Sequence, residues 1–76
     1  MSRWVPCKRR DFVRRLREIG FEGPFSGARH QFMLYEQHRL AIPSIAEYSV
    51  LQLRVMIREV EEIIGREITV EEWNRL

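Results

Sequence analysis

One short stretch of the sequence carries the residues best suited to chemistry. A turn at Gly27 and Ala28 leads directly into Arg29 and His30, and an apolar, aromatic segment follows. Histidine is the only side chain whose ordinary pKa lets it take up and release a proton near neutral pH. Cleavage of RNA through its own 2′-hydroxyl needs such a proton carrier and a cation that stabilises the charged phosphorane. The stretch therefore predicts a catalytic His30 with a phosphate-binding Arg29.

Other chemistries have less support in the sequence. The single cysteine and the two histidines, Cys7, His30 and His38, are too few and too scattered for a zinc site. Gly23 and Gly27 do not open a helix, which excludes the glycine-rich loops that bind nucleotide phosphates. Cys7 has no evident base and is interpreted as a structural thiol, and His38 as a solvated residue. We therefore expect no metal and no cofactor.

Length and composition bound the class of protein. Residues 1–76 form one domain, since a chain of this size has no room for a second core. With one cysteine, the chain cannot form an internal disulfide. No apolar stretch approaches the ~20 residues of a membrane span, and the N-terminus lacks the apolar core of a signal peptide. We expect a cytoplasmic protein with no membrane partner.

Charge is distributed unevenly along the chain. Residues 1–40 carry nine Lys and Arg against four Asp and Glu, a net charge of +5, whereas residues 41–76 carry four against seven, a net charge of −3. A basic front half indicates a polyanionic partner, and the acidic half is typical of a solvated face or a protein contact. A basic helix can equally be a solvated face.

Apolar spacing predicts the helices that position these residues. Phe12, Val13, Leu16 and Ile19 recur at helical spacing and predict a helix over 7–19, which Gly20 ends. A second helix over 50–64 begins with a capping box of Ser49 and Gln52. Thr69 with Glu72 repeats the capping box and predicts a short C-terminal helix.

The segment between the two long helices has the character of strands. Strands are predicted over about 21–25, 30–36 and 39–42, with short connections that imply an antiparallel meander. The expected fold is therefore α+β, in the order α-β-β-β-α, with a three-stranded antiparallel sheet and two helices on one face. The sequence leaves open which face carries His30, Phe32 and Leu34.

These features together resemble the HicA-type toxins of toxin–antitoxin pairs. The resemblance rests on the segments 16–21, 27–32 and 42–43 and on the helix over 50–65. It implies a fold like the double-stranded RNA-binding domain and an mRNA-cleaving activity in which Gly27 to His30 carry the catalytic histidine. Two departures are Ala28, where the family has a small hydroxyl residue, and Ser44, where many members have a second histidine.

The resemblance and the charges together define the expected partners, which are mRNA and a HicB-like antitoxin that forms a hetero-oligomer with the chain. Seven residues are expected to bind RNA: Lys8, Arg9, Arg10, Arg14, Arg17, Arg29 and Arg39. Arg15 is not counted, because it lies at the edge of the buried stripe. Two other readings stay open: a non-catalytic RNA-binding module of the same fold, and a protein-interaction domain that uses the acidic half.

Overall fold

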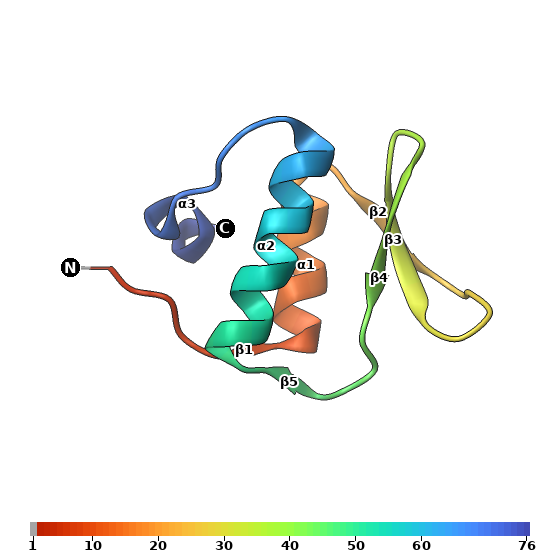
Figure 1. Cartoon of the computed structure of the whole chain (residues 1–76), viewed down its shortest axis with the longest axis horizontal. Coiled ribbons are helices and arrows are strands. Elements are labelled where there is room, and N and C mark those ends of the chain that lie inside the picture. The colour runs from red at the N-terminus through yellow and green to blue at the C-terminus, as the bar shows by residue number, and fades with distance from the viewer. Residues whose placement is uncertain (1) are drawn as a thin grey trace.

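The computed structural model describes residues 2–76, which form three helices and five short strands (Figure 1). In chain order they are β1 (Cys7–Lys8), α1 (Arg9–Ile19), β2 (Glu22–Phe25), β3 (Gln31–Tyr35), β4 (His38–Ile42), β5 (Glu47–Tyr48), α2 (Val50–Ile64) and α3 (Val70–Arg75). The predicted α+β class is confirmed, and so is the order of the two long helices, the three main strands and the short C-terminal helix.

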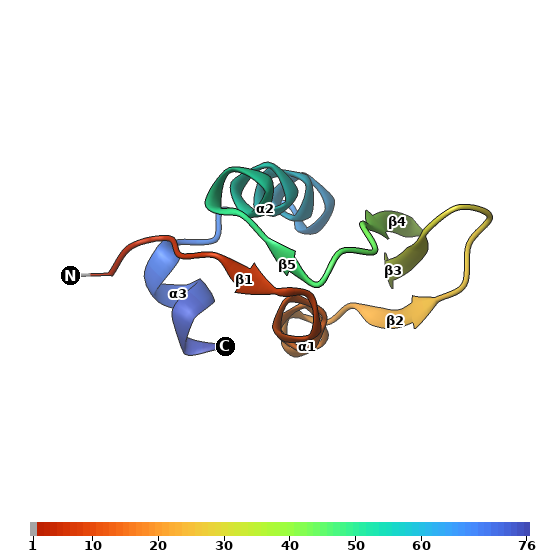
Figure 2. The ribbon, with the colours of Figure 1, turned by 90° about the horizontal axis from the view of Figure 1, so that it is seen from below.

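The molecule is built in layers. Strands β2, β3 and β4 form an antiparallel sheet in that order, and α1 and α2 lie side by side against one of its faces (Figures 1 and 2). Helix α3 and the N-terminal segment lie on the far side of the helix pair. Within residues 2–76, no helix or strand covers the other face of the sheet.

Strand register settles which side chains face the helices. Met33 pairs with Leu40 across β3 and β4, and both side chains are buried in the core together with Ile42. Because neighbouring side chains on a strand alternate, Phe32 and Leu34 lie on the opposite, uncovered face. The sequence predicted that Phe32 and Leu34 share one face with His30, and the structure shows that Phe32 and Leu34 lie on the outer face.

The predicted start of the first helix, at residue 7, was wrong. Cys7 and Lys8 instead pair with Tyr48 and Glu47 in a two-stranded antiparallel ribbon, β1 with β5. The ribbon continues into α1 through the Arg9 backbone N–H, which donates to the Ala46 oxygen at 2.9 Å. Strands of two residues show no periodicity in a sequence, and so neither was predicted.

Of the two predicted capping boxes, the structure forms one completely and the other only in part. At the start of α2, the Ser49 hydroxyl and the Gln52 side chain each bond the other's backbone N–H, as predicted. Thr69 accepts from the Glu72 N–H at the start of α3, but the Glu72 carboxylate pairs with Arg66 at 2.8 Å. The second capping box is thus half formed.

None of the helices in residues 2–76 has the length and apolar character needed to cross a membrane.

Strand boundaries also differ from the prediction, and the difference affects the candidate catalytic residue. Strand β3 begins at Gln31, so His30 lies in the bend before the strand rather than inside it. The turn between β3 and β4 is formed by Glu36 and Gln37, with Glu36 at a φ of 55°. His38, which was interpreted as a solvated residue, is the first residue of β4 and is exposed.

An aromatic cluster closes the core on the side away from the sheet. The ring of Phe12 in α1 lies 5.5 Å from that of Tyr48 and 5.6 Å from that of Trp73 in α3. All three side chains are fully or almost fully buried. Arg15 lies over the Trp73 ring at 5.2 Å, so its side chain belongs to this cluster, consistent with its exclusion from the RNA-binding set.

Candidate functional site

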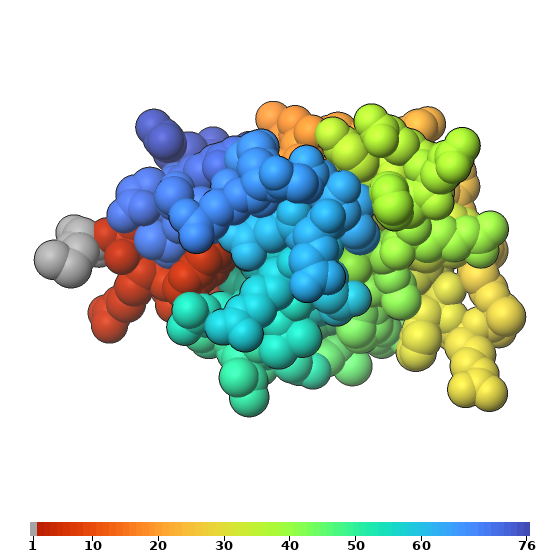
Figure 3. All heavy atoms as spheres, turned by 45° about the horizontal axis from the view of Figure 1, so that its top comes forward, coloured from red at the N-terminus to blue at the C-terminus, as the bar shows by residue number. Residues whose placement is uncertain are grey.

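His30 lies at the end of the exposed connection between β2 and β3. Its side chain is exposed, and the chain around residue 30 stands out at one end of the molecule (Figure 3). The turn before it is tight: a Cβ atom on Gly27 would overlap the backbone oxygen of His30. Only glycine therefore fits this position, and the close approach fixes the course of the chain into His30.

Arg9 ties three elements together next to His30. Its Nε donates to the Pro43 backbone oxygen at 3.3 Å, and a terminal nitrogen donates to Gln31 Oε1 at 2.5 Å. The first turn of α1 is thus fixed to the start of β3 and to the chain that leaves β4. A guanidinium has five N–H donors, so these two bonds fix Arg9 in position without using all of its donors.

These residues surround an open hollow of about 460 Å³. It is lined by Arg9, Arg29, His30, Gln31, Ser44, Ile45 and Ala46. Three of the residues predicted to act on RNA, Arg9, Arg29 and His30, therefore meet at one place. A proton carrier and two guanidinium groups around one hollow suit a phosphodiester, since arginine can bind two phosphate oxygens at once.

Three more predicted RNA-binding residues form a stripe along α1. Arg10, Arg14 and Arg17 are all exposed, and spacings of three and four residues place them on one helix face. Arg17 Nε donates to the Gly23 oxygen at 2.8 Å, which shows that this face borders β2. Lys8 is exposed at the N-cap of the same helix. The stripe thus extends from the N-terminal turn of α1 towards β2.

Arg39, the seventh predicted RNA-binding residue, lies on the outer face of the sheet and does not line the hollow. Its guanidinium carbon is 4.5 Å from the centre of the Phe32 ring, and the Phe32 ring lies 5.6 Å from that of Phe25. Arg39 was expected to bind RNA, and the structure places it apart from the hollow at His30. Its charge is on a neighbouring strand but on the uncovered face.

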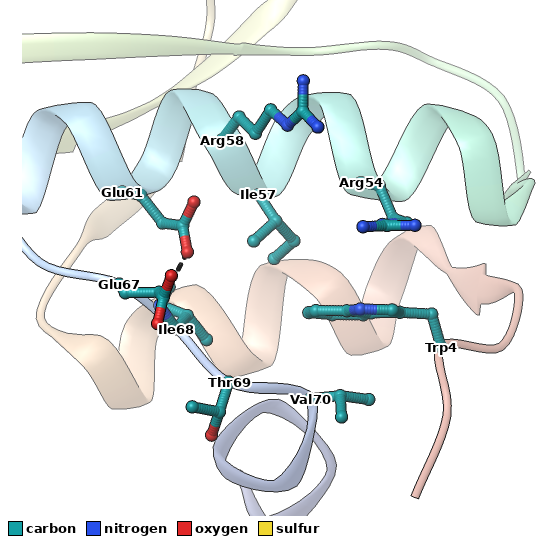
Figure 4. Close-up of a pocket in the computed structure, with 9 residues that line it drawn as sticks. All are labelled: Trp4, Arg54, Ile57, Arg58, Glu61, Glu67, Ile68, Thr69 and Val70. Carbon is teal, nitrogen blue, oxygen red and sulfur yellow. Dashed lines mark hydrogen bonds between the residues drawn. The ribbon is translucent and has the colours of Figure 1, made fainter.

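A second hollow, of about 320 Å³, lies on the other side of the helix pair, between α2, the N-terminal segment and the chain that leads into α3 (Figure 4). Figure 4 shows Arg54 extending over Trp4 at one end, and at the other end Glu61 accepts from the Ile68 backbone N–H at 2.7 Å. No histidine or cysteine lines this hollow. The bond between Glu61 and Ile68 fixes the chain between α2 and α3.

Two titratable side chains are buried in the core rather than displayed at the site. Burial raises the pKa of the Cys7 thiol, which keeps it in the unreactive protonated form. Burial also raises the pKa of Tyr48, whose hydroxyl donates to the Pro43 oxygen at 2.6 Å. This geometry favours the structural interpretation of Cys7.

Neither a metal-binding group of side chains nor a similar known protein assigns a function to the described residues. Within residues 2–76, no group of three His, Cys, Asp or Glu side chains is arranged to hold a metal ion. Comparison of the chain with models of protein families, with curated proteins and with solved structures gives no significant match. The hollow at His30 is therefore the feature of the molecule that points to a function.

Sequence reasoning missed the residues that complete this hollow. The Arg9 contacts with Gln31 and Pro43 join parts of the chain that no local pattern connects. Ser44 also lines the hollow, and it is the position at which the sequence departs from the second histidine of the toxin family. That correspondence is the one signal in the sequence that could have placed Ser44 beside His30.

Proposed function

We propose that this chain is a metal-independent endoribonuclease of the HicA type, the toxin of a toxin–antitoxin pair that cleaves mRNA. The observation that carries the proposal is the meeting of His30 with Arg9 and Arg29 around one open hollow. The order of α1, a three-stranded antiparallel sheet and α2, with both helices on one face, also supports the expected likeness to double-stranded RNA-binding domains.

In the proposed reaction, the imidazole of His30 accepts the proton of a ribose 2′-hydroxyl, and the 2′-oxygen attacks the adjacent phosphorus. Arg9 and Arg29 stabilise the charge that develops on the phosphorane oxygens. The bond to the 5′-oxygen breaks, and that oxygen takes a proton from water. The products are a 2′,3′-cyclic phosphate and a 5′-hydroxyl. One positioned histidine contributes about 10²–10⁴ in rate, which is sufficient for a slow, message-damaging enzyme.

The exposed cations explain how RNA would be held during this reaction. The stripe of Arg10, Arg14 and Arg17 and the N-cap residue Lys8 supply phosphate contacts along α1, next to the hollow. Such contacts position the RNA without reading its sequence. The shape of an A-form helix or the path of a single strand would both be compatible with this stripe.

The proposed toxin needs a protein that silences it in its own cytoplasm. We expect a HicB-like antitoxin that covers the hollow, with acidic or site-plugging groups opposite Arg9, Arg29 and His30. Charge complementarity would make association fast and sensitive to salt. The complex would be a hetero-oligomer of toxin and antitoxin.

A comparison of the two histidine variants tests the proposed activity. His30→Ala is expected to abolish RNA cleavage, whereas His38→Ala, which changes the other exposed histidine, is expected to cleave like the wild type. Excess chelator should have no effect, and 2′-deoxy substitution at the scissile nucleotide should block the reaction. Cleavage by His30→Ala, or loss of cleavage in chelator, would contradict the proposal. RNA binding by a wild type that never cleaves would instead support a non-catalytic RNA-binding module.

A further inference from the structure

The uncovered face of the sheet carries a row of stacked flat groups. From β4 to β2, the Arg39 guanidinium lies 4.5 Å from the Phe32 ring, and the Phe32 ring lies 5.6 Å from the Phe25 ring at an angle of 37°. We call Phe25, Phe32 and Arg39 the stacking face. Met33 and Leu40 face the helices, so the alternation of side chains places this face on the other side of the sheet.

Both ends of the stacking face are open to solvent. Phe25 is 41% exposed, and Arg39 is exposed as well. Phe32 between them is half-buried, and the position of a Cβ on Gly27 would be 3.4 Å from its ring. The tight turn that fixes His30 therefore also packs against the edge of this aromatic row.

The stacking face and the candidate catalytic residue are close neighbours. Phe32 follows His30 by two residues, roughly 7 Å along an extended backbone. Phe25 ends β2 on the other side of the same connection. Phe25 and Phe32 therefore lie in the first cross-strand row of this face after His30, and Arg39, which pairs with Leu34, lies in the next row.

We propose that the stacking face binds an unpaired base of single-stranded RNA next to the scissile phosphate, with the base against Phe25 and a flanking phosphate near Arg39. This inference rests on the proposed ribonuclease function and specifies its substrate class. Every base has a flat π-surface, so stacking on an aromatic ring holds a strand without selecting its sequence. A nucleic-acid base that stacks on Phe25 adds one more flat group to the row of Arg39, Phe32 and Phe25.

Charge and geometry favour single-stranded RNA over the alternatives. In a duplex, each base is already stacked on its neighbours, and its face is not available to Phe25. Phe25 and Phe32 form the cross-strand row nearer His30, and Arg39 lies in the next row together with Leu34 and Glu22. The face is therefore aromatic on the side of the hollow, with the Arg39 cation in the row beyond it.

The test measures affinity for a fully 2′-O-methylated RNA oligonucleotide, which cannot be cleaved, by fluorescence anisotropy. Phe25→Ala is expected to weaken binding of the single strand roughly 5- to 150-fold, the usual effect of removing one stacking residue. Phe25→Tyr, which keeps a flat ring, should restore wild-type affinity. Leu51→Ala is the matched control, since Leu51 is a 76%-exposed apolar residue on α2 and should change nothing. A duplex of the same sequence should bind all four proteins alike.

Unchanged affinity of Phe25→Ala for the single strand would overturn the inference and assign the face to contact with a protein. An equal loss of affinity for the duplex would overturn it too, because duplex bases offer no free face. Neither result depends on cleavage, since the oligonucleotide is inert. Failure of the stacking face is thus separate from failure of the ribonuclease, which the His30→Ala cleavage assay decides.

Discussion

Arg9 donates a hydrogen bond to the side chain of Gln31, the residue that directly follows His30. The same guanidinium also holds the Pro43 oxygen, so the start of α1 is fixed to both sides of the candidate site. Arg9 was predicted as one of several phosphate-binding cations. The structure gives it a second role as the residue that positions the entry to β3.

Replacing Arg9 by lysine tests this positioning role. Arg9→Lys keeps the charge but loses the planar fork that reaches Gln31 and Pro43 together, and lysine does not replace arginine at such sites. We expect about 1 kcal/mol less stability in urea unfolding, typical of a lost side-chain bond, and a fall in cleavage of about tenfold. Arg58→Lys on the exposed face of α2 is the control and should match the wild type. Full cleavage by Arg9→Lys would show that its charge alone matters.

Gly27→Ala tests the tight turn before His30. A Cβ atom at this position overlaps the His30 backbone oxygen, so the turn must open and the imidazole must move. We expect cleavage to fall about 10- to 100-fold, the scale of a displaced catalytic group. The free energy of unfolding should change by less than about 1 kcal/mol, because the turn is exposed. Ser26→Ala in the same turn should have no effect on either measurement. Equal cleavage by Gly27→Ala would exclude a need for this geometry.

The dependence of RNA affinity on salt should distinguish free arginines from occupied ones. Arg10→Ala and Arg14→Ala each remove an exposed cation, and each should reduce the slope of log affinity against log salt by about 0.7–0.9. Arg17→Ala should reduce it less, because part of its guanidinium is committed to the Gly23 oxygen. Arg58→Ala serves as the control. If the first two variants keep the wild-type slope, the stripe on α1 does not contact phosphate.

Alkaline pH should destabilise the fold through Cys7. Burial raises the thiol pKa in the folded state above its ordinary value of 9.0, so the folded chain keeps its proton where the unfolded chain releases it. The resulting stability is complete below the unfolded pKa and is lost as pH rises towards the folded one. We expect the free energy of unfolding to fall above pH ~8.5, by at most about 1.4 kcal/mol per pH unit from this group. Cys7→Ala should show a shallower decline in urea unfolding measured between pH 7 and pH 10. An identical decline would assign the effect to other groups, Tyr48 first.

The features that the sequence predicted well are those with local signals. Apolar spacing places both long helices, the Ser49 capping box marks the first turn of α2, and Gly20 marks the end of α1. The antiparallel sheet follows from short connections between aromatic and β-branched segments. These features depend on residues that are close together in the sequence.

The features that were missed depend on residues that are far apart. The pairing of Cys7 with Tyr48 displaces the start of α1 by two residues, because a β ribbon takes the segment that helical spacing also suits. His30 leaves the strand because the Gly27 turn is closed on its backbone. The outer position of Phe32 and Arg39 was undetermined because both faces of β3 are partly apolar, and only packing against the helices decides between them.

The contact of Phe12 with Tyr48 and Trp73 has a consequence for local opening of the fold. Helix α1 cannot detach without breaking packing against β5 and α3 at once, so its backbone amides should exchange hydrogen for deuterium only through global unfolding. The amides of residues 26–30, which are exposed and lie outside any strand, should exchange at once. The proposed site therefore joins a helix expected to open slowly to a segment expected to open fast, and Arg9 and His30 lie on opposite sides of that boundary.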